Sequence, residues 1–200
     1  ARHLAKTYGV PPAGGPSVFT MEPGYKARKL FERDCAGCHV GKDRKGPEII
    51  AGYNSRQWIA DLMRNPNGHR FFGVTKIDLM KPVTETGEDF DALVELMYAQ
   101  TGADDVDKSL VEKGQVLFDD GSCIDCHSID WETEDDVGPN LGRRGSVEML
   151  KAFIEEPGHP RWFGDKNEMP GYKGKYSPAE LDELVQYLYE LKDANPAGSE

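Results

Sequence analysis

The sequence predicts an all-α protein made of two similar units in tandem. Apolar residues recur at helical spacing in segments that end at helix-capping residues, and no segment alternates as a strand would. The pattern Cys-x-x-Cys-His occurs twice, 88 residues apart, beginning at Cys35 and at Cys123. Similar segments follow the two copies in the same order, which indicates an internal duplication.

The expected elements follow one another in the same order in both units. The first 22 residues contain closely spaced Pro and Gly and predict an irregular N-terminal arm, 1–22. We assign the first unit to residues 23–103 and the second to residues 104–200. The first unit should contain helices at 24–34, 55–63 and 88–101, and the second should contain helices at 107–119, 146–154 and 178–193.

Capping residues set the ends of these helices. Ser55 and Ser146 are favourable N-caps, and each middle helix should stop before a proline, Pro66 in one unit and Pro157 in the other. Ser177 is followed by Pro178 and Glu180, the pattern of an N-cap, a proline at the first helical position and a capping box.

Each Cys-x-x-Cys-His motif predicts the covalent attachment of one haem. The thiols of Cys35 and Cys38, or of Cys123 and Cys126, would bond the porphyrin vinyl groups, and the next residue, His39 or His127, would bind the iron. The alternatives are a zinc site or a dithiol redox pair. A four-thiolate zinc site would not require a histidine after each cysteine pair. We therefore expect two covalently attached haem c groups.

The order of helix, haem motif, loop, helix, methionine and closing helix resembles class I c-type cytochromes. A Gly-Pro pair follows each motif, at Gly46-Pro47 and Gly138-Pro139. The resemblance covers nearly all of residues 24–193 and implies two tandem class I cytochrome c domains, each surrounding one covalent haem. It also implies that Pro47 and Pro139 orient the haem-binding histidines through their backbone carbonyls.

The resemblance implies that Met80 and Met169 are the sixth ligands of the two irons. Met80 follows His39 by 41 residues and Met169 follows His127 by 42, so the sequence favours the ligand pairs His39/Met80 and His127/Met169. Met169-Pro170 has the family pattern, whereas Lys81 separates Met80 from its proline. The rival ligands His69 and His159 do not align with each other when the two units are superimposed.

Trp58 is a candidate for a hydrogen bond from its indole N–H to a haem propionate. Ordinary core packing is the alternative interpretation, because the second unit has Met149 at the equivalent position.

Charge divides the chain into two unlike halves. Residues 1–103 have a net charge of +2 and residues 104–200 a net charge of −13, within a total of −11. An acidic chain argues against nucleic acid as a partner. The asymmetry indicates two different docking surfaces, and solubility alone is the alternative.

No run of apolar residues is long enough to span a membrane. Haem c is normally attached outside the cytoplasmic membrane. We therefore expect a periplasmic location, with an export segment or anchor that this sequence does not include.

Function follows from these sites. The segment from Trp58 to Gly73 is similar to the cytochrome c portions that accompany cytochrome b in bacterial quinol:cytochrome c reductases. This implies electron transfer from a cytochrome b/Rieske-type complex to a soluble cytochrome or an oxidase, without catalysis by the chain itself. The alternatives are a free periplasmic dihaem carrier, a haem subunit of another oxidoreductase and a dihaem peroxidase. A peroxidase would keep one iron open, and two methionine ligands would close both.

Overall fold

The computed structural model describes residues 24–77, 80–134 and 137–194, and within them every regular element is a helix. The predicted arm, 1–22, lies outside the described residues. The helical fold agrees with the all-α class predicted from the sequence. None of the described helices is long and apolar enough to cross a membrane.

The helices of the first unit have nearly the predicted limits. They are α2 (Tyr25–Asp34), α3 (Ala36–His39), α4 (Arg56–Arg64) and α5 (Gly87–Ala99), with a short 3-10 helix, η2 (Phe72–Val74), before Met80. The Ser55 side chain accepts a hydrogen bond from the backbone N–H of Trp58, as an N-cap should.

The second unit repeats this pattern, except that no helix corresponding to α3 is assigned among its described residues and a further 3-10 helix follows the closing helix. It contains α6 (Lys108–Asp120), α7 (Val147–Glu155), η3 (Gly164–Lys166), α8 (Pro178–Glu190) and η4 (Leu191–Asp193). Ser146 caps α7, and Ser177 and Glu180 form both hydrogen bonds of the predicted capping box on α8.

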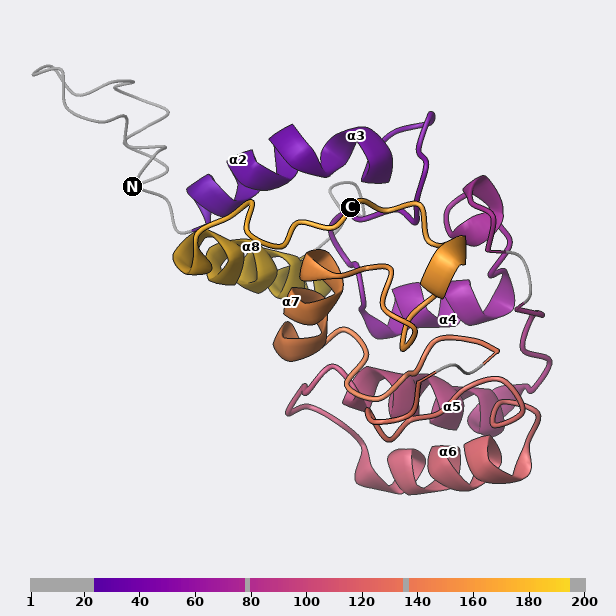
Figure 1. Cartoon of the computed structure of the whole chain (residues 1–200). Helices are drawn as coiled ribbons and strands as arrows, with labels where there is room; N and C mark the ends of the chain where they lie inside the picture. Colours follow the sequence, from indigo (N-terminus) through magenta and orange to yellow (C-terminus); the bar gives the residue numbers. More distant parts are fainter. Residues whose placement is uncertain (1–23, 78–79, 135–136, 195–200) are drawn as a thin grey trace, which may run out of the picture.

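Helices from the two sequence units pair with each other. α2 packs against α8, and α5 packs against α6, so each pair joins one helix from each side of the predicted boundary at residue 103 (Figure 1). The middle helices stay with their own units, because α4 contacts α5 and α7 contacts α8. Two hydrophobic clusters result, one around α4, α5 and α6 and the other around α2, α7 and α8.

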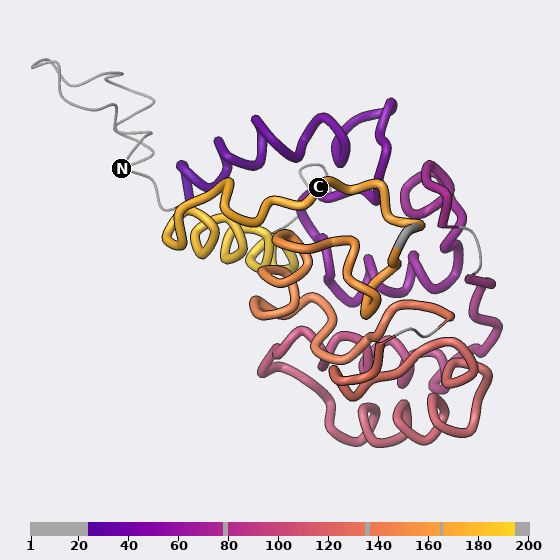
Figure 2. The backbone as a smooth tube through the Cα atoms, viewed as in Figure 1, coloured from indigo at the N-terminus to yellow at the C-terminus, as the bar shows by residue number. Residues whose placement is uncertain are grey.

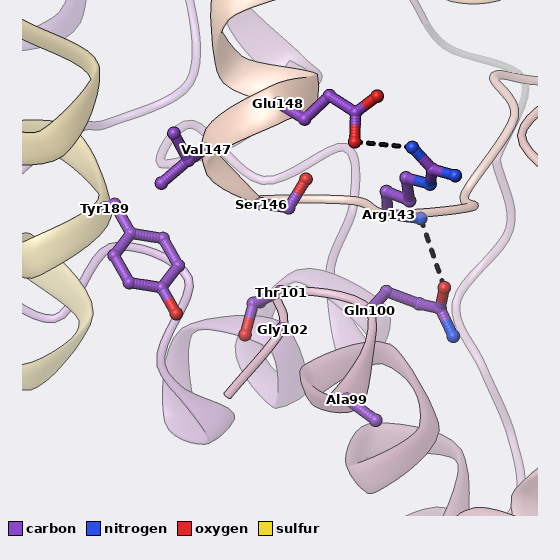
Figure 3. A pocket seen from close by; sticks show the side chains of 9 residues that line it. All are labelled: Ala99, Gln100, Thr101, Gly102, Arg143, Ser146, Val147, Glu148 and Tyr189. Carbon is purple, nitrogen blue, oxygen red and sulfur yellow. Dashed lines mark hydrogen bonds and ion pairs between the residues drawn. The ribbon is translucent and has the colours of Figure 1, made fainter. Parts of the chain in front are cut away.

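The two clusters meet where the end of α5 approaches the start of α7. Figure 3 shows an open pocket at this junction, lined from α5, the 143–148 segment and Tyr189 of α8. Arg143 links the two sides, because its backbone N–H donates to Gln100 Oε1 at 3.1 Å; its guanidinium pairs with Glu148 on its own side. No residue of either Cys-x-x-Cys-His motif lines this pocket.

Candidate haem-binding sites

Each motif histidine lies against the backbone carbonyl of the proline in the Gly-Pro pair that follows its motif. His39 Nδ1 lies 2.8 Å from the carbonyl oxygen of Pro47, and His127 Nδ1 lies 2.8 Å from that of Pro139. A carbonyl oxygen can only accept, so Nδ1 carries a hydrogen, and in the neutral imidazole Nε2 then carries the lone pair. A histidine that binds a metal through Nε2 has this tautomer and this kind of support.

The glycine before each of these prolines leaves room for the imidazole. A Cβ atom on Gly46 would lie 2.9 Å from His39 Cε1, and one on Gly138 would lie 2.5 Å from His127 Cε1. The same loops are anchored to the motifs, because Gly46 N–H donates to the Cys38 carbonyl at 3.1 Å and Gly138 N–H to the Cys126 carbonyl at 2.7 Å. In each Gly-Pro pair, the glycine therefore leaves space for the histidine ring, and the proline carbonyl accepts its hydrogen bond.

The four thiols are free and remain in two separate pairs. Cys35, Cys123 and Cys126 are half-buried, and Cys38 is exposed. Burial raises the pKa of the Cys35 thiol to about 11, and burial also raises the pKa of the Cys123 thiol. No group of three or more His, Cys, Asp or Glu side chains among the described residues is arranged to hold a metal ion.

These features fit a haem attached at each motif. Two thiols three residues apart precede a histidine whose Nε2 lone pair is defined. One cysteine of each pair packs against a hydrophobic cluster: Cys35 on the cluster that contains Leu30 and Phe31, and Cys123 on the cluster that contains Phe118. Cys35, Cys38 and His39 would hold one haem, and Cys123, Cys126 and His127 would hold the other.

Met80 and Met169 occupy equivalent positions in the two units. Val83 N–H donates to the carbonyl of Met63 at 2.8 Å, and Tyr172 N–H donates to the carbonyl of Ile154 at 3.0 Å. Met63 and Ile154 are each the eighth residue of their middle helix, and each candidate methionine precedes its N–H donor by three residues. The residue inserted after Met80 therefore does not change the register of the methionine.

An asparagine ties each methionine segment to the end of its middle helix. Asn67, which follows Pro66, donates from Nδ2 to the Met80 carbonyl at 3.0 Å. In the second unit the asparagine comes from the other side: Asn167 donates to the Pro157 carbonyl at 2.8 Å and accepts from Met169 N–H at 2.9 Å. The two units reach the same local link with residues that do not align.

The rival histidines are not equivalent in the structure either. Phe71 N–H donates to the Gly68 carbonyl and Trp162 N–H to the His159 carbonyl, so His159 corresponds to Gly68. His69 is exposed, with Nδ1 3.3 Å from Arg44. His159 Nε2 lies 3.6 Å from Glu134. The non-equivalence of the two histidines confirms the sequence alignment.

Trp58 makes the contacts of a core residue. Its side chain is 3% exposed, and its indole N–H donates to the Glu48 carbonyl at 3.3 Å. Its ring makes edge contacts with Tyr53 and Phe71. The Arg144 guanidinium lies 5.3 Å from the ring and burial lowers its pKa.

A group of contacts on Asp34 was not predicted from the sequence. The Tyr172 hydroxyl donates to the Asp34 backbone carbonyl at 3.0 Å, and the Tyr176 hydroxyl donates to Asp34 Oδ2 at 2.8 Å. Lys175 lies 3.2 Å from the same carboxylate, which Arg33 also contacts, and these groups lower the pKa of Asp34. The contacts with Tyr172, Lys175 and Tyr176 span more than 130 residues, so no local sequence signal indicates them.

Residues 109–188 match the family model described as Cytochrome C oxidase, cbb3-type, subunit III. The match supports a c-type cytochrome. It runs from α6 to α8 and includes the second haem motif and Met169. A domain of this type implies a covalently bound haem c, redox protein partners and a role in electron transfer. Comparisons with curated proteins and with solved structures give no match.

Proposed function

We propose that the chain carries two haem c groups and passes single electrons between redox partners. The observation that carries this proposal is the identical support of both motif histidines, each held at 2.8 Å by the carbonyl of the proline in a Gly-Pro pair. The family model covers the second motif alone, and the geometry of the first motif repeats that of the second.

Both irons take a histidine and a methionine ligand in this proposal. A bound haem c supplies an iron that accepts and releases one electron, and a neutral thioether ligand favours the ferrous state. Methionine at both irons leaves no open position for a substrate. Cys35, Cys38 and His39 would hold one haem, and Cys123, Cys126 and His127 would hold the other.

The segments before the two methionines touch, which supports electron passage between the sites. The rings of Phe72 and Phe163 lie 5.5 Å apart, and Lys76 Nζ lies 2.6 Å from a Glu168 carboxylate oxygen. Phe72 and Phe163 occupy equivalent positions in the two units, and Lys76 and Glu168 follow η2 and η3. The two proposed haem sites therefore belong to one packed unit.

The proposed role is the cytochrome c component of a quinol-oxidising respiratory complex on the periplasmic side of the membrane. A cytochrome b/Rieske-type complex would donate electrons, and a soluble cytochrome or an oxidase would accept them. The name of the matching family favours a second candidate, a haem subunit of a terminal oxidase. The two roles differ in which neighbouring complex reacts fastest with the chain.

Haem content is the direct test of the proposal. Mass spectrometry of the denatured holoprotein should show the polypeptide plus two haems, because thioether bonds survive denaturation. A redox titration followed by absorption should resolve two one-electron steps, with the weak sulfur-to-iron band of the oxidised protein in the far red. One haem, or haem that acidified solvent extracts, would contradict the proposal.

Charge supplies the test of the partners. An acidic segment follows the second motif, where Asp130 accepts hydrogen bonds from Thr133 that lower its pKa to about 2. We expect a basic cytochrome to react with this side faster at low salt than at high salt. Neutralising the acidic group should remove that salt dependence: Glu132, Glu134, Asp135 and Asp136. The last two lie outside the described residues.

The matched control neutralises Lys42 and Lys45, which are exposed after the first motif. It should leave the reaction with a basic cytochrome unchanged. Reduction by a quinol:cytochrome c reductase and oxidation by a cbb3-type oxidase, measured on the same holoprotein, would separate the two candidate roles. Slow reaction with the reductase and fast reaction with the oxidase would favour the oxidase subunit.

A further inference from the structure

The helix that precedes each haem motif packs against the closing helix of the other sequence unit. α2 leads into the first motif and packs against α8, the closing helix of the second unit (Figure 1). α6 leads into the second motif and packs against α5, the closing helix of the first unit. Within the described part of the chain, α2 does not contact α5 and α6 does not contact α8.

The segment after Met169 lies against the first haem motif. Tyr172 and Tyr176 bind Asp34, the residue immediately before Cys35, at 3.0 and 2.8 Å. Met169 and Tyr172 pack on the hydrophobic cluster on which Cys35 also packs. Figure 2 shows this part of the chain, in orange and yellow, running beside α2 and the start of the first motif. Met169 is therefore linked to the first motif through the hydrogen bond of Tyr172, three residues later, to Asp34.

The segment after Met80 lies in the same way against the second motif. Val83 and Cys123 pack on one hydrophobic cluster, together with Met63 of α4 and Phe118 of α6. Lys113 of α6 bridges to the first turn of α5 through Glu88 and Asp89, at 2.8 Å each.

α5 of the first unit and α6 of the second unit cross at very short distance. A Cβ atom on Gly114 of α6 would lie 2.3 Å from the carbonyl oxygen of Ala92 in α5 and 2.9 Å from Leu96 Cβ. Backbone approach of this kind requires glycine at position 114. The residue at the corresponding position of α2 is Ala27, which is 0% exposed.

Other contacts stay within one unit. Glu48 N–H donates to the Arg70 carbonyl at 2.9 Å, and Asn140 N–H donates to the Arg161 carbonyl at 2.8 Å. The loops that support the histidines are thus tied to their own units, whereas the methionine segments and closing helices are exchanged. The ligands of one haem would then come from different units.

We propose that the axial ligands are paired across the two units, with His39 and Met169 on one iron and His127 and Met80 on the other. The inference rests on the proposed function, because it requires a haem at each motif. It replaces the pairing favoured by sequence order, in which each methionine serves the motif that precedes it.

The test combines two substitutions: one shifts the absorption spectrum of one haem, and the other removes the methionine ligand from one iron. Cys38→Ser leaves the first haem attached through one thioether, so one vinyl group stays conjugated and the absorption bands of that haem shift to longer wavelength. Met169→Leu or Met80→Leu then removes one axial thioether with little change in volume. Carbon monoxide added to the reduced protein binds the opened iron, and the difference spectrum shows whether that haem is the shifted one.

Crossed pairing gives a definite pattern. With Cys38→Ser, carbon monoxide should bind the shifted haem in the Met169→Leu protein and the unshifted haem in the Met80→Leu protein. Moving the label to the second haem with Cys126→Ser should reverse both results. The opposite pattern would establish pairing within each unit and overturn the inference.

Two controls keep the outcomes distinct. Mass spectrometry counts the haems first, so a missing haem in the unlabelled protein counts against the proposed function rather than against the pairing. If the Cys38→Ser protein loses its haem, the Cys126→Ser protein still distinguishes the two pairings, and the reverse also holds. Met149→Leu changes a half-buried methionine of α7 and should open neither iron. Binding of carbon monoxide by that control, or its absence from both ligand variants, would also overturn the inference.

Discussion

Gly114→Ala is expected to destabilise the protein although alanine is the better helix former. Gly114 is buried within α6, where the helix crosses α5. The added methyl group would lie 2.3 Å from the Ala92 carbonyl oxygen and 2.9 Å from the Ala92 carbonyl carbon. Both atoms belong to the backbone of α5, so no side-chain rotation can relieve the contact.

The magnitude follows from two opposing effects. Alanine in place of glycine should favour the helix by about 1 kcal/mol. Carbon and oxygen normally approach to about 3.3 Å, so the two helices must separate by about 1 Å at the crossing. Overpacking of this kind costs about 1–3 kcal/mol, and contact with backbone argues for the upper end. The net loss in the free energy of unfolding should be about 2 kcal/mol.

Denaturant unfolding of the holoprotein, followed by far-ultraviolet circular dichroism, measures this loss. Gly37→Ala is the matched control, because a Cβ atom there meets no other atom within 4 Å. The second motif carries Asp125 at the same position, so a side chain is compatible with the motif. The control should change the free energy of unfolding by less than about 0.5 kcal/mol. Unchanged or increased stability of Gly114→Ala would refute the close crossing of α5 and α6.

Two further substitutions test other parts of the structure. Glu95 is 5% exposed and receives two hydrogen bonds from Arg56, at 2.6 and 2.8 Å, which lower its pKa. Because Arg56 is partly exposed, Glu95→Gln should cost about 2 kcal/mol, below the value for a fully buried pair. A lowered folded-state pKa stabilises the protein above the unfolded-state pKa, so the difference from wild type should be full above about pH 5 and should shrink as the pH falls further. An unfolding series across pH checks this, and a difference that grows on acidification would contradict it. Gly138→Ala should displace the His127 ring and change the absorption spectrum of one haem, since its Cβ would lie 2.5 Å from Cε1; an unaltered spectrum would contradict the proposed seat.

Local features of the fold were predictable because local residues determine them. Ser55, Ser146 and Ser177 mark the starts of helices through their side-chain oxygens, and the prolines that follow α4 and α7 end those helices. The hydrogen bonds of His39 to Pro47 and of His127 to Pro139 span only 8 and 12 residues, so the family pattern could indicate them.

The pairing of helices could not be predicted in the same way. In a duplicated chain, α2 has two candidate partners, α5 and α8, which are the closing helices of the two units. The contacts of Asp34 with Tyr172 and Tyr176 decide between the two, and they connect residues about 140 positions apart. The sequence left open whether the residue inserted after Met80 moves Met80 out of the position that Met169 occupies. The hydrogen bond from Val83 to Met63, which matches that from Tyr172 to Ile154, shows that it does not.

The pairing of α2 with α8 sets an order of assembly. A chain made from its N-terminus contains the first haem motif long before it contains α8, whereas α4, α5 and α6 are complete by residue 120. The cluster around α4, α5 and α6 can fold from segments that are close in sequence. The cluster around α2 and α8 requires contacts across most of the sequence, which slows its folding. Until α8 is made, Leu30 and Phe31 lack the helix that they pack against in the folded protein, and under the proposed function the Cys35 and Cys38 thiols would stay accessible for haem attachment during that time.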